Sequence, residues 1–163
     1  MQTMALAELD ATIKEFNGDP DRIYLTGFSQ GGNGVLRMAS KWPERFAAIV
    51  DVAGFVKPDL FPGRHAEVLN EDLRSHPFLR TGNPYTVTAE RIKKVPIWIF
   101  HGDADSSIPV SESRQLVAAL KSLGATVLYT EYPDTEHSPS NVNVWQRKTS
   151  LLGFSDSVEK DRF

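Results

Sequence analysis

The sequence predicts an α/β fold in which a mostly parallel sheet of about four strands is flanked by helices. Two observations indicate this class. Short apolar runs alternate along the chain with segments of helical periodicity, as in successive β–α units. The apolar runs are also nearly continuous, which is typical of strands buried on both faces of a parallel sheet.

The first part of the chain predicts a helix, a strand and a second helix. The first helix is indicated by apolar residues at helical spacing, which are Leu6, Leu9, Ile13 and Phe16. Asn17 and Gly18 follow it as a stop signal. A strand is expected over 22–26 and a glycine-rich bend over 27–34. The helix after the bend should end before Pro43, because proline disfavours helical backbone in the residue before it. Its inward residues are expected to be Val35, Met38 and Ala39.

A second strand is expected over 46–52, where apolar residues dominate. Residues 56–94 have a different character, with four prolines, two histidines and mixed charge. We interpret them as a cap-like insertion with short helices.

The last part of the chain returns to the β–α pattern. Strands are expected over 95–100 and 126–132, with a helix over 111–123 between them. Ser111 is a candidate N-cap for this helix, and Gly124 suits the position just after its end. Residues 141–154 are a candidate for a last helix.

Composition narrows the function classes. The 163 residues suffice for one domain, residues 1–163, with a substantial core. The net charge of −3 and the lack of a basic cluster argue against nucleic-acid binding. The chain has no cysteine, which rules out disulfides and thiolate zinc sites. No apolar run approaches the ~20 residues of a membrane span. Residues 1–10 do not resemble a signal peptide, so a cytoplasmic location is the default expectation.

The strongest motif is the glycine-rich bend. Residues 27–31, Gly-Phe-Ser-Gln-Gly, match G-x-S-x-G between a predicted strand and a predicted helix, which is the context the motif requires. We expect Ser29 to be a nucleophile on a strained turn, with Gly27 and Gly31 needed because side chains there would collide. The backbone N–H of Gln30 would then stabilise an oxyanion. A phosphate-binding loop is disfavoured, because no Lys-Ser/Thr pair follows the glycines.

A serine nucleophile needs a histidine base, and the chain offers four histidines. His65 and His76 lie in the irregular insertion and are expected at the surface. His101 ends the third strand, where a structural hydrogen bond is the favoured role. His137 follows the last strand and is the favoured base, because the acid precedes the histidine in hydrolases with this motif.

Three aspartates are candidates for the acid that orients His137. Asp103 and Asp105 follow the third strand, and Asp51 ends the second strand. Asp105 is favoured, because it lies further into the loop and can turn toward the histidine. Asp103 would rather brace the turn through its backbone, and Asp51 is the minority alternative.

Four segments together resemble the α/β-hydrolase superfamily, near its polyester-depolymerase, feruloyl-esterase, phospholipase/carboxylesterase and dienelactone-hydrolase-like members. They are residues 22–32, 95–105, 108–110 and 131–137. In that pattern the aspartate three residues before the Ile-Pro pair is the acid, which here is Asp105. The resemblance implies a serine carboxylesterase that cleaves small or short-acyl esters through an acyl-enzyme on Ser29, without metal or cofactor. Feruloyl, polyester or thioester substrates are alternatives, as is an inactive remnant that acts as an interaction module.

The chain departs from this family in one respect. Family members have several strands before the nucleophile strand, including a loop that supplies a second oxyanion N–H, and here one helix precedes it. The expected fold is thus a truncated α/β-hydrolase. Strand 22–26 would become an exposed edge, which predicts self-association, most simply as a homodimer.

Overall fold

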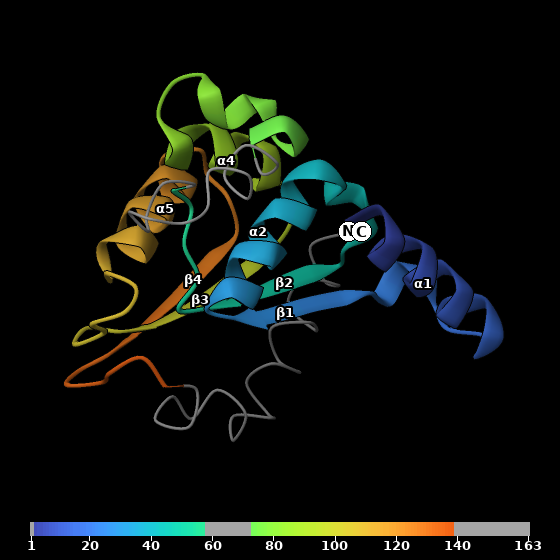
Figure 1. The fold of residues 1–163 in the computed structure, drawn as a ribbon, viewed down its shortest axis with the longest axis horizontal. Coiled ribbons are helices and arrows are strands. Elements are labelled where there is room, and N and C mark those ends of the chain that lie inside the picture. The colour runs from blue at the N-terminus through green and yellow to red at the C-terminus, as the bar shows by residue number, and fades with distance from the viewer. Residues whose placement is uncertain (1, 58–72, 139–163) are drawn as a thin grey trace.

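The computed structural model describes residues 2–57 and 73–138. It contains one four-stranded parallel sheet with the strand order β1-β2-β3-β4 (Figure 1). The strands are β1 (Tyr24–Phe28), β2 (Ala48–Val52), β3 (Ile97–Gly102) and β4 (Val127–Tyr132). The helices are α1 (Gln2–Glu15), α2 (Gln30–Lys41), α4 (Pro84–Ile92) and α5 (Ser111–Ser122). The predicted fold class is confirmed.

The main core lies between the sheet and three helices. Figure 1 shows α2, α4 and α5 on the same side of the sheet, while α1 lies beyond the N-terminal end of strand β1. Side chains alternate between the two faces of a strand, so Ile97 and Ile99 face the helices while Trp98 and Phe100 face the opposite side. On that opposite side the rings of Trp98 and Phe100 stack with centroids 4.7 Å apart. Both faces of β3 are therefore buried, as the continuous apolar run indicates.

Several element boundaries differ from the expectation. β1 begins at Tyr24 rather than at residue 22, because Pro20–Arg22 forms a 3₁₀ turn that the Asp19 side chain caps. Helix α5 begins at Ser111, so its N-cap residue is Val110 and not Ser111 as expected. No side chain forms a capping hydrogen bond there. Gly124 follows α5 with φ +68°, as expected of a residue just past a helix end. Phe16 lies past the end of α1 and is 73% exposed, so it does not join the core.

Part of the interval 56–94 is built into the core. Tyr85, Ala89 and Ile92 of α4 are buried in the same apolar cluster as the residues of α2 and α5. Residues 58–72, with His65, lie outside the described residues, as does the candidate helix 141–154. A cap formed by 56–94 remains a prediction. Within the described ranges, no helix is both long and apolar enough to cross a membrane.

Candidate active site

Three polar side chains meet at the carboxyl edge of the sheet. Ser29 directly follows β1, Asp105 lies in the loop after β3, and His137 lies in the loop after β4. The Nε2 of His137 is 2.9 Å from the Oγ of Ser29, and its Nδ1 is 2.6 Å from Oδ2 of Asp105. The structure thus brings together the three residues that the sequence singled out, in one hydrogen-bonded series.

The turn between β1 and α2 holds Ser29 in an unusual backbone conformation, with φ 57° and ψ −117°. Its N–H donates to the Val52 carbonyl on β2 at 2.8 Å, and its carbonyl accepts from the N–H of Asn33 at 3.0 Å. Bonds to a neighbouring strand and to the first turn of α2 therefore fix the strained residue. Such strain costs about 1–3 kcal/mol, which the surrounding structure must offset.

The glycine requirement is confirmed at one of its two positions. A Cβ at Gly27 would overlap the backbone of Gly31, so any side chain is excluded there. A Cβ at Gly31 would meet nothing within 4 Å, so the expectation that it would collide is wrong. The second restricted glycine is instead Gly32, where a Cβ would overlap the carboxyl of Asp51 and the backbone of Gly54.

The loop after β3 holds the Asp105 carboxylate on both of its oxygens. Oδ1 accepts the N–H groups of Ser107 and Ile108 at 2.9 and 2.8 Å, while Oδ2 faces His137. Because an ionised carboxylate only accepts, Nδ1 of His137 carries the proton, and Nε2 can accept the proton of Ser29. The side chain of Asp105 is 0% exposed and that of His137 is 18% exposed, so the acid is fully buried while the base is partly accessible to solvent.

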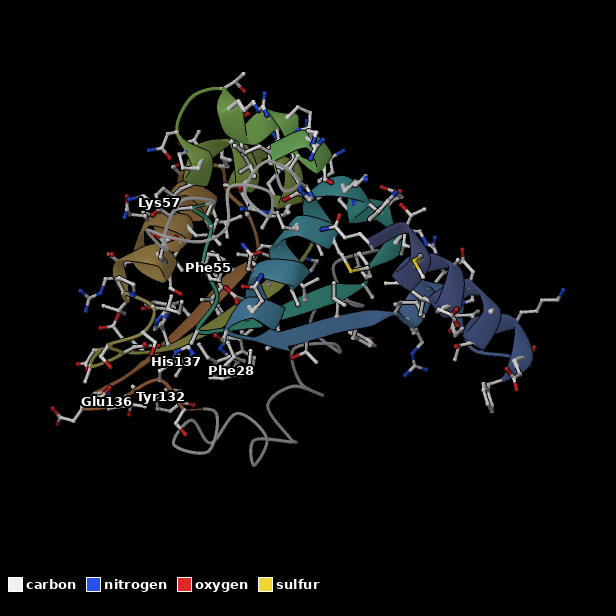
Figure 2. All side chains as sticks on the ribbon, viewed as in Figure 1. Phe28, Phe55, Lys57, Tyr132, Glu136 and His137 are labelled. Carbon is white, nitrogen blue, oxygen red and sulfur yellow. The ribbon has the colours of Figure 1, made fainter. Side chains whose placement is uncertain are left out.

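The face of the His137 ring packs on an aromatic neighbour. Phe28 lies directly before Ser29, and its ring centroid is 4.7 Å from that of His137, at an interplanar angle of 33°. Figure 2 shows the two side chains next to each other. The imidazole is therefore fixed at both nitrogens and on one face.

The remaining histidines have other surroundings. His101 is buried and hydrogen-bonds to Ser113 at 2.7 Å and to the Ile108 carbonyl at 3.0 Å, which confirms its expected structural role. Its Nε2 also lies 3.3 Å from Oδ2 of Asp105, and burial lowers its pKa. His76 is 1% exposed rather than at the surface, so that expectation is wrong. His76 directly precedes the 3₁₀ turn Pro77–Arg80, in which Leu79 is also buried.

The other two candidate acids do not contact His137. Asp103 is exposed and its N–H donates to the Tyr132 carbonyl, so it braces the turn through its backbone as expected. Asp51 is buried, and its carboxyl lies against the backbone of Gly32 and Gly54. Burial raises the pKa of Asp51 to about 7.

Gln30, the expected oxyanion donor, is the first residue of α2. The first N–H groups of a helix have no intrahelical partner and point out of its positive end, which suits a developing negative charge. Among residues 2–57 and 73–138, no group of His, Asp or Glu side chains has the arrangement of a metal site.

Sequence reasoning missed two contacts at this site. One is the packing of Phe28 on His137, and the other is the approach of His101 to Asp105. The motif places Phe28 next to the nucleophile, but nothing local indicates which face of the turn its ring covers. The four-residue spacing of His101 and Asp105 does not by itself predict their contact, because the contact depends on the path of the loop after β3.

Comparison with known proteins gives consistent results. The family model described as "Prolyl oligopeptidase family" matches residues 5–161. The "Probable carboxylic ester hydrolase LipM" of Mycobacterium tuberculosis is 30% identical over an alignment of 162 positions, which covers 82% of this chain and 36% of that protein. The "Acyl-protein thioesterase 1" of Gibberella zeae is 26% identical over 119 residues, which cover 73% of this chain and 42% of that protein.

Solved structures share the fold. A structure titled "Crystal Structure of a Thermostable Esterase" superposes with a TM-score of 0.68 at 26% identity, over 94% of this chain and 36% of the esterase. The sheet and its helices therefore match an α/β-hydrolase fold. The chain spans less than half the length of each of these three proteins.

Proposed function

This chain belongs to the prolyl oligopeptidase family, and from that premise we propose that it hydrolyses carboxylic esters through an acyl-enzyme on Ser29. The observation that carries the proposal is the hydrogen-bonded series from Ser29 through His137 to Asp105. A serine hydroxyl is a weak nucleophile, and this arrangement is the known means of activating one. Relatives named as ester hydrolases favour an ester over other acyl substrates.

In the proposed reaction, Ser29 Oγ attacks the ester carbonyl carbon while His137 Nε2 takes the hydroxyl proton. Asp105 keeps the imidazole oriented and stabilises its positive charge. The Gln30 N–H donates to the oxyanion of the tetrahedral intermediate. As that intermediate collapses, the protonated His137 gives its proton to the departing alkoxide. Water, activated by His137 in the same way, then releases the acid and restores Ser29.

Small or short-acyl esters are the proposed substrates, with a thioester as the alternative that a specific relative supports. The loss of one oxyanion donor can lower turnover by on the order of 10²–10³. We therefore expect the backbone N–H of Gln30 to contribute a large share of the turnover.

The test is hydrolysis of nitrophenyl acetate and butyrate by the wild type and by Ser29→Ala, alongside a small thioester and a feruloyl ester. Ser122→Ala is the matched control, because Ser122 is an exposed serine at the end of α5. We expect Ser29→Ala to lose at least ~100-fold in kcat/KM, and Ser122→Ala to match the wild type. Equal rates in the wild type and Ser29→Ala would support the inactive remnant instead.

A further inference from the structure

A buried histidine outside the proposed triad touches the acid of that triad. We infer that His101 is a positioning residue whose Nε2–H fixes Oδ2 of Asp105, the oxygen that orients His137. This inference rests on the proposed function of Ser29, His137 and Asp105. It concerns the contact of 3.3 Å between Nε2 of His101 and Oδ2 of Asp105, where both side chains are 0% exposed.

The neighbours of His101 determine which nitrogen carries its proton. The Ile108 carbonyl, 3.0 Å from Nε2, can only accept, so Nε2 must be the donor. Nδ1 then accepts from the Ser113 hydroxyl at 2.7 Å. Burial lowers the pKa of His101, which favours this neutral form with a single ring proton. The Nε2–H is thus held between the Ile108 carbonyl and Oδ2 of Asp105.

This arrangement completes the hydrogen bonding of a buried carboxylate. Oδ1 of Asp105 is held by two N–H groups of its own loop. Without His101, the one donor to Oδ2 among the residues that the structure describes would be His137. With His101 present, an N–H group of β3 lies 3.3 Å from Oδ2, next to the bond that Oδ2 makes with His137 from the loop after β4. Outer hydrogen-bond partners of metal ligands fix the orientation of those ligands, and their loss typically costs 10- to 100-fold in function. We take the same range for His101, which stands in a similar relation to Asp105.

Two amide substitutions distinguish a role of His101 in contacting Asp105 from a role in merely filling space. In His101→Gln the amide reaches the position of Nε2 and can still donate to Asp105. In His101→Asn the shorter amide reaches only the position of Nδ1, next to Ser113. His101→Leu removes both polar contacts at similar volume.

The experiment measures kcat and KM for nitrophenyl acetate, per active site counted by labelling Ser29 with a fluorophosphonate. We expect His101→Asn and His101→Leu to lose about 10- to 100-fold in kcat with KM changed less than about 3-fold, and His101→Gln to stay within about 3-fold of the wild type. Counting active sites removes the effect of a partly unfolded sample. If His101→Leu fails to fold, the comparison of Asn with Gln decides. Equal kcat in the Asn and Gln variants would overturn the inference.

A spectroscopic readout keeps this test separate from that of the proposed function. The proton between His137 Nδ1 and Asp105 should give a strongly downfield ¹H NMR signal in the wild type and in His101→Gln. It should move or broaden in His101→Asn, because Oδ2 of Asp105 is then less well fixed. If the wild type lacks Ser29-dependent turnover, the proposed function fails, and an unchanged signal in His101→Asn would overturn the positioning role independently.

Discussion

Gly27 and Gly31 face each other across the turn that carries Ser29, so closely that a Cβ on Gly27 would overlap the carbonyl group of Gly31. The reverse does not hold, since a Cβ on Gly31 would point into open space. The two glycines of the motif therefore differ in what the turn demands of them. Close approach to the backbone of residue 31 requires glycine at position 27, whereas no contact among the described residues requires glycine at position 31.

Alanine at these two positions should change stability in opposite directions. Gly27→Ala must displace backbone and should lower the free energy of unfolding by at least about 1–3 kcal/mol. Gly31→Ala lies in the first turn of α2 without a clash and should raise it by up to about 1 kcal/mol, because alanine loses less backbone entropy. Urea unfolding of both variants gives the two values. A Gly27→Ala protein as stable as the wild type would contradict the geometry of the turn.

Asp51 predicts a pH-dependent stability. Burial raises its pKa from 3.8 to about 7 in the folded protein, so the folded state holds a proton that the unfolded state releases between these values. The stabilisation is fully present below about pH 4 and is lost as the pH rises to about 7, with a limit of about 4 kcal/mol. Asp51→Asn cannot titrate, and its stability relative to the wild type should rise over this interval. Urea unfolding at pH 4.5, 6 and 8 checks this, and a constant difference would contradict it.

The fold and the polar site were predictable because their signals are local or ordered along the chain. The apolar runs at 97–100 and 127–129 determine strands regardless of their neighbours. The motif around Ser29 fixes a turn by the backbone alone. The positions of Asp105 and His137 follow from chain order in a parallel sheet, whose carboxyl ends share one edge.

Features that depend on tertiary contacts were harder to predict from the sequence. The burial of His76 arises from packing of its 3₁₀ turn, which an irregular, proline-rich stretch does not reveal. The restriction at Gly32 depends on Asp51 and Gly54, which belong to a different strand and loop. The packing of Phe28 on His137 joins residues from opposite ends of the sheet order. No periodicity along the chain encodes such pairs.

Glu112 of α5 should be a major determinant of stability. Its buried carboxylate accepts the N–H groups of Val56 and Lys57 at 2.8 and 3.1 Å and the Tyr85 hydroxyl at 2.6 Å. It thereby ties the segment after β2 to α4 and α5. Glu112→Gln keeps one acceptor oxygen for the two N–H groups and presents its NH₂ group to the Tyr85 hydroxyl, which can accept, so the loss of the negative charge should cost about 1–2 kcal/mol. Tyr85→Phe removes one bond and should cost about 1–2 kcal/mol.

Urea unfolding of Glu112→Gln, Tyr85→Phe and the double variant measures these losses. Because the two side chains bond to each other, the double variant should lose less than the sum of the single losses. Additive losses would show that the Tyr85 bond contributes nothing. A Glu112→Gln protein with wild-type stability would contradict the role of the carboxylate in holding the segment after β2.

The free edge of β1 predicts self-association. Within the described ranges, β1 has a strand on one side only, and its outer residues Tyr24 and Thr26 are exposed, Tyr24 at 48%. An edge with unpaired N–H and C=O groups is a template for another strand, and a second copy of the chain can present the same edge in a two-fold dimer. Tyr24→Lys places a charged side chain on this edge in both copies and should shift the dimer toward monomer.

Size-exclusion chromatography with light scattering measures this equilibrium at several protein concentrations. The matched control is Leu128→Lys on β4, the opposite edge strand, where the leucine is 42% exposed. The wild type and Leu128→Lys should be dimeric at the concentration where Tyr24→Lys is monomeric, because only the β1 edge is in the proposed interface. A wild type that remains monomeric at all concentrations would rule out this association. If Leu128→Lys alone yields monomer, the interface lies at β4 instead.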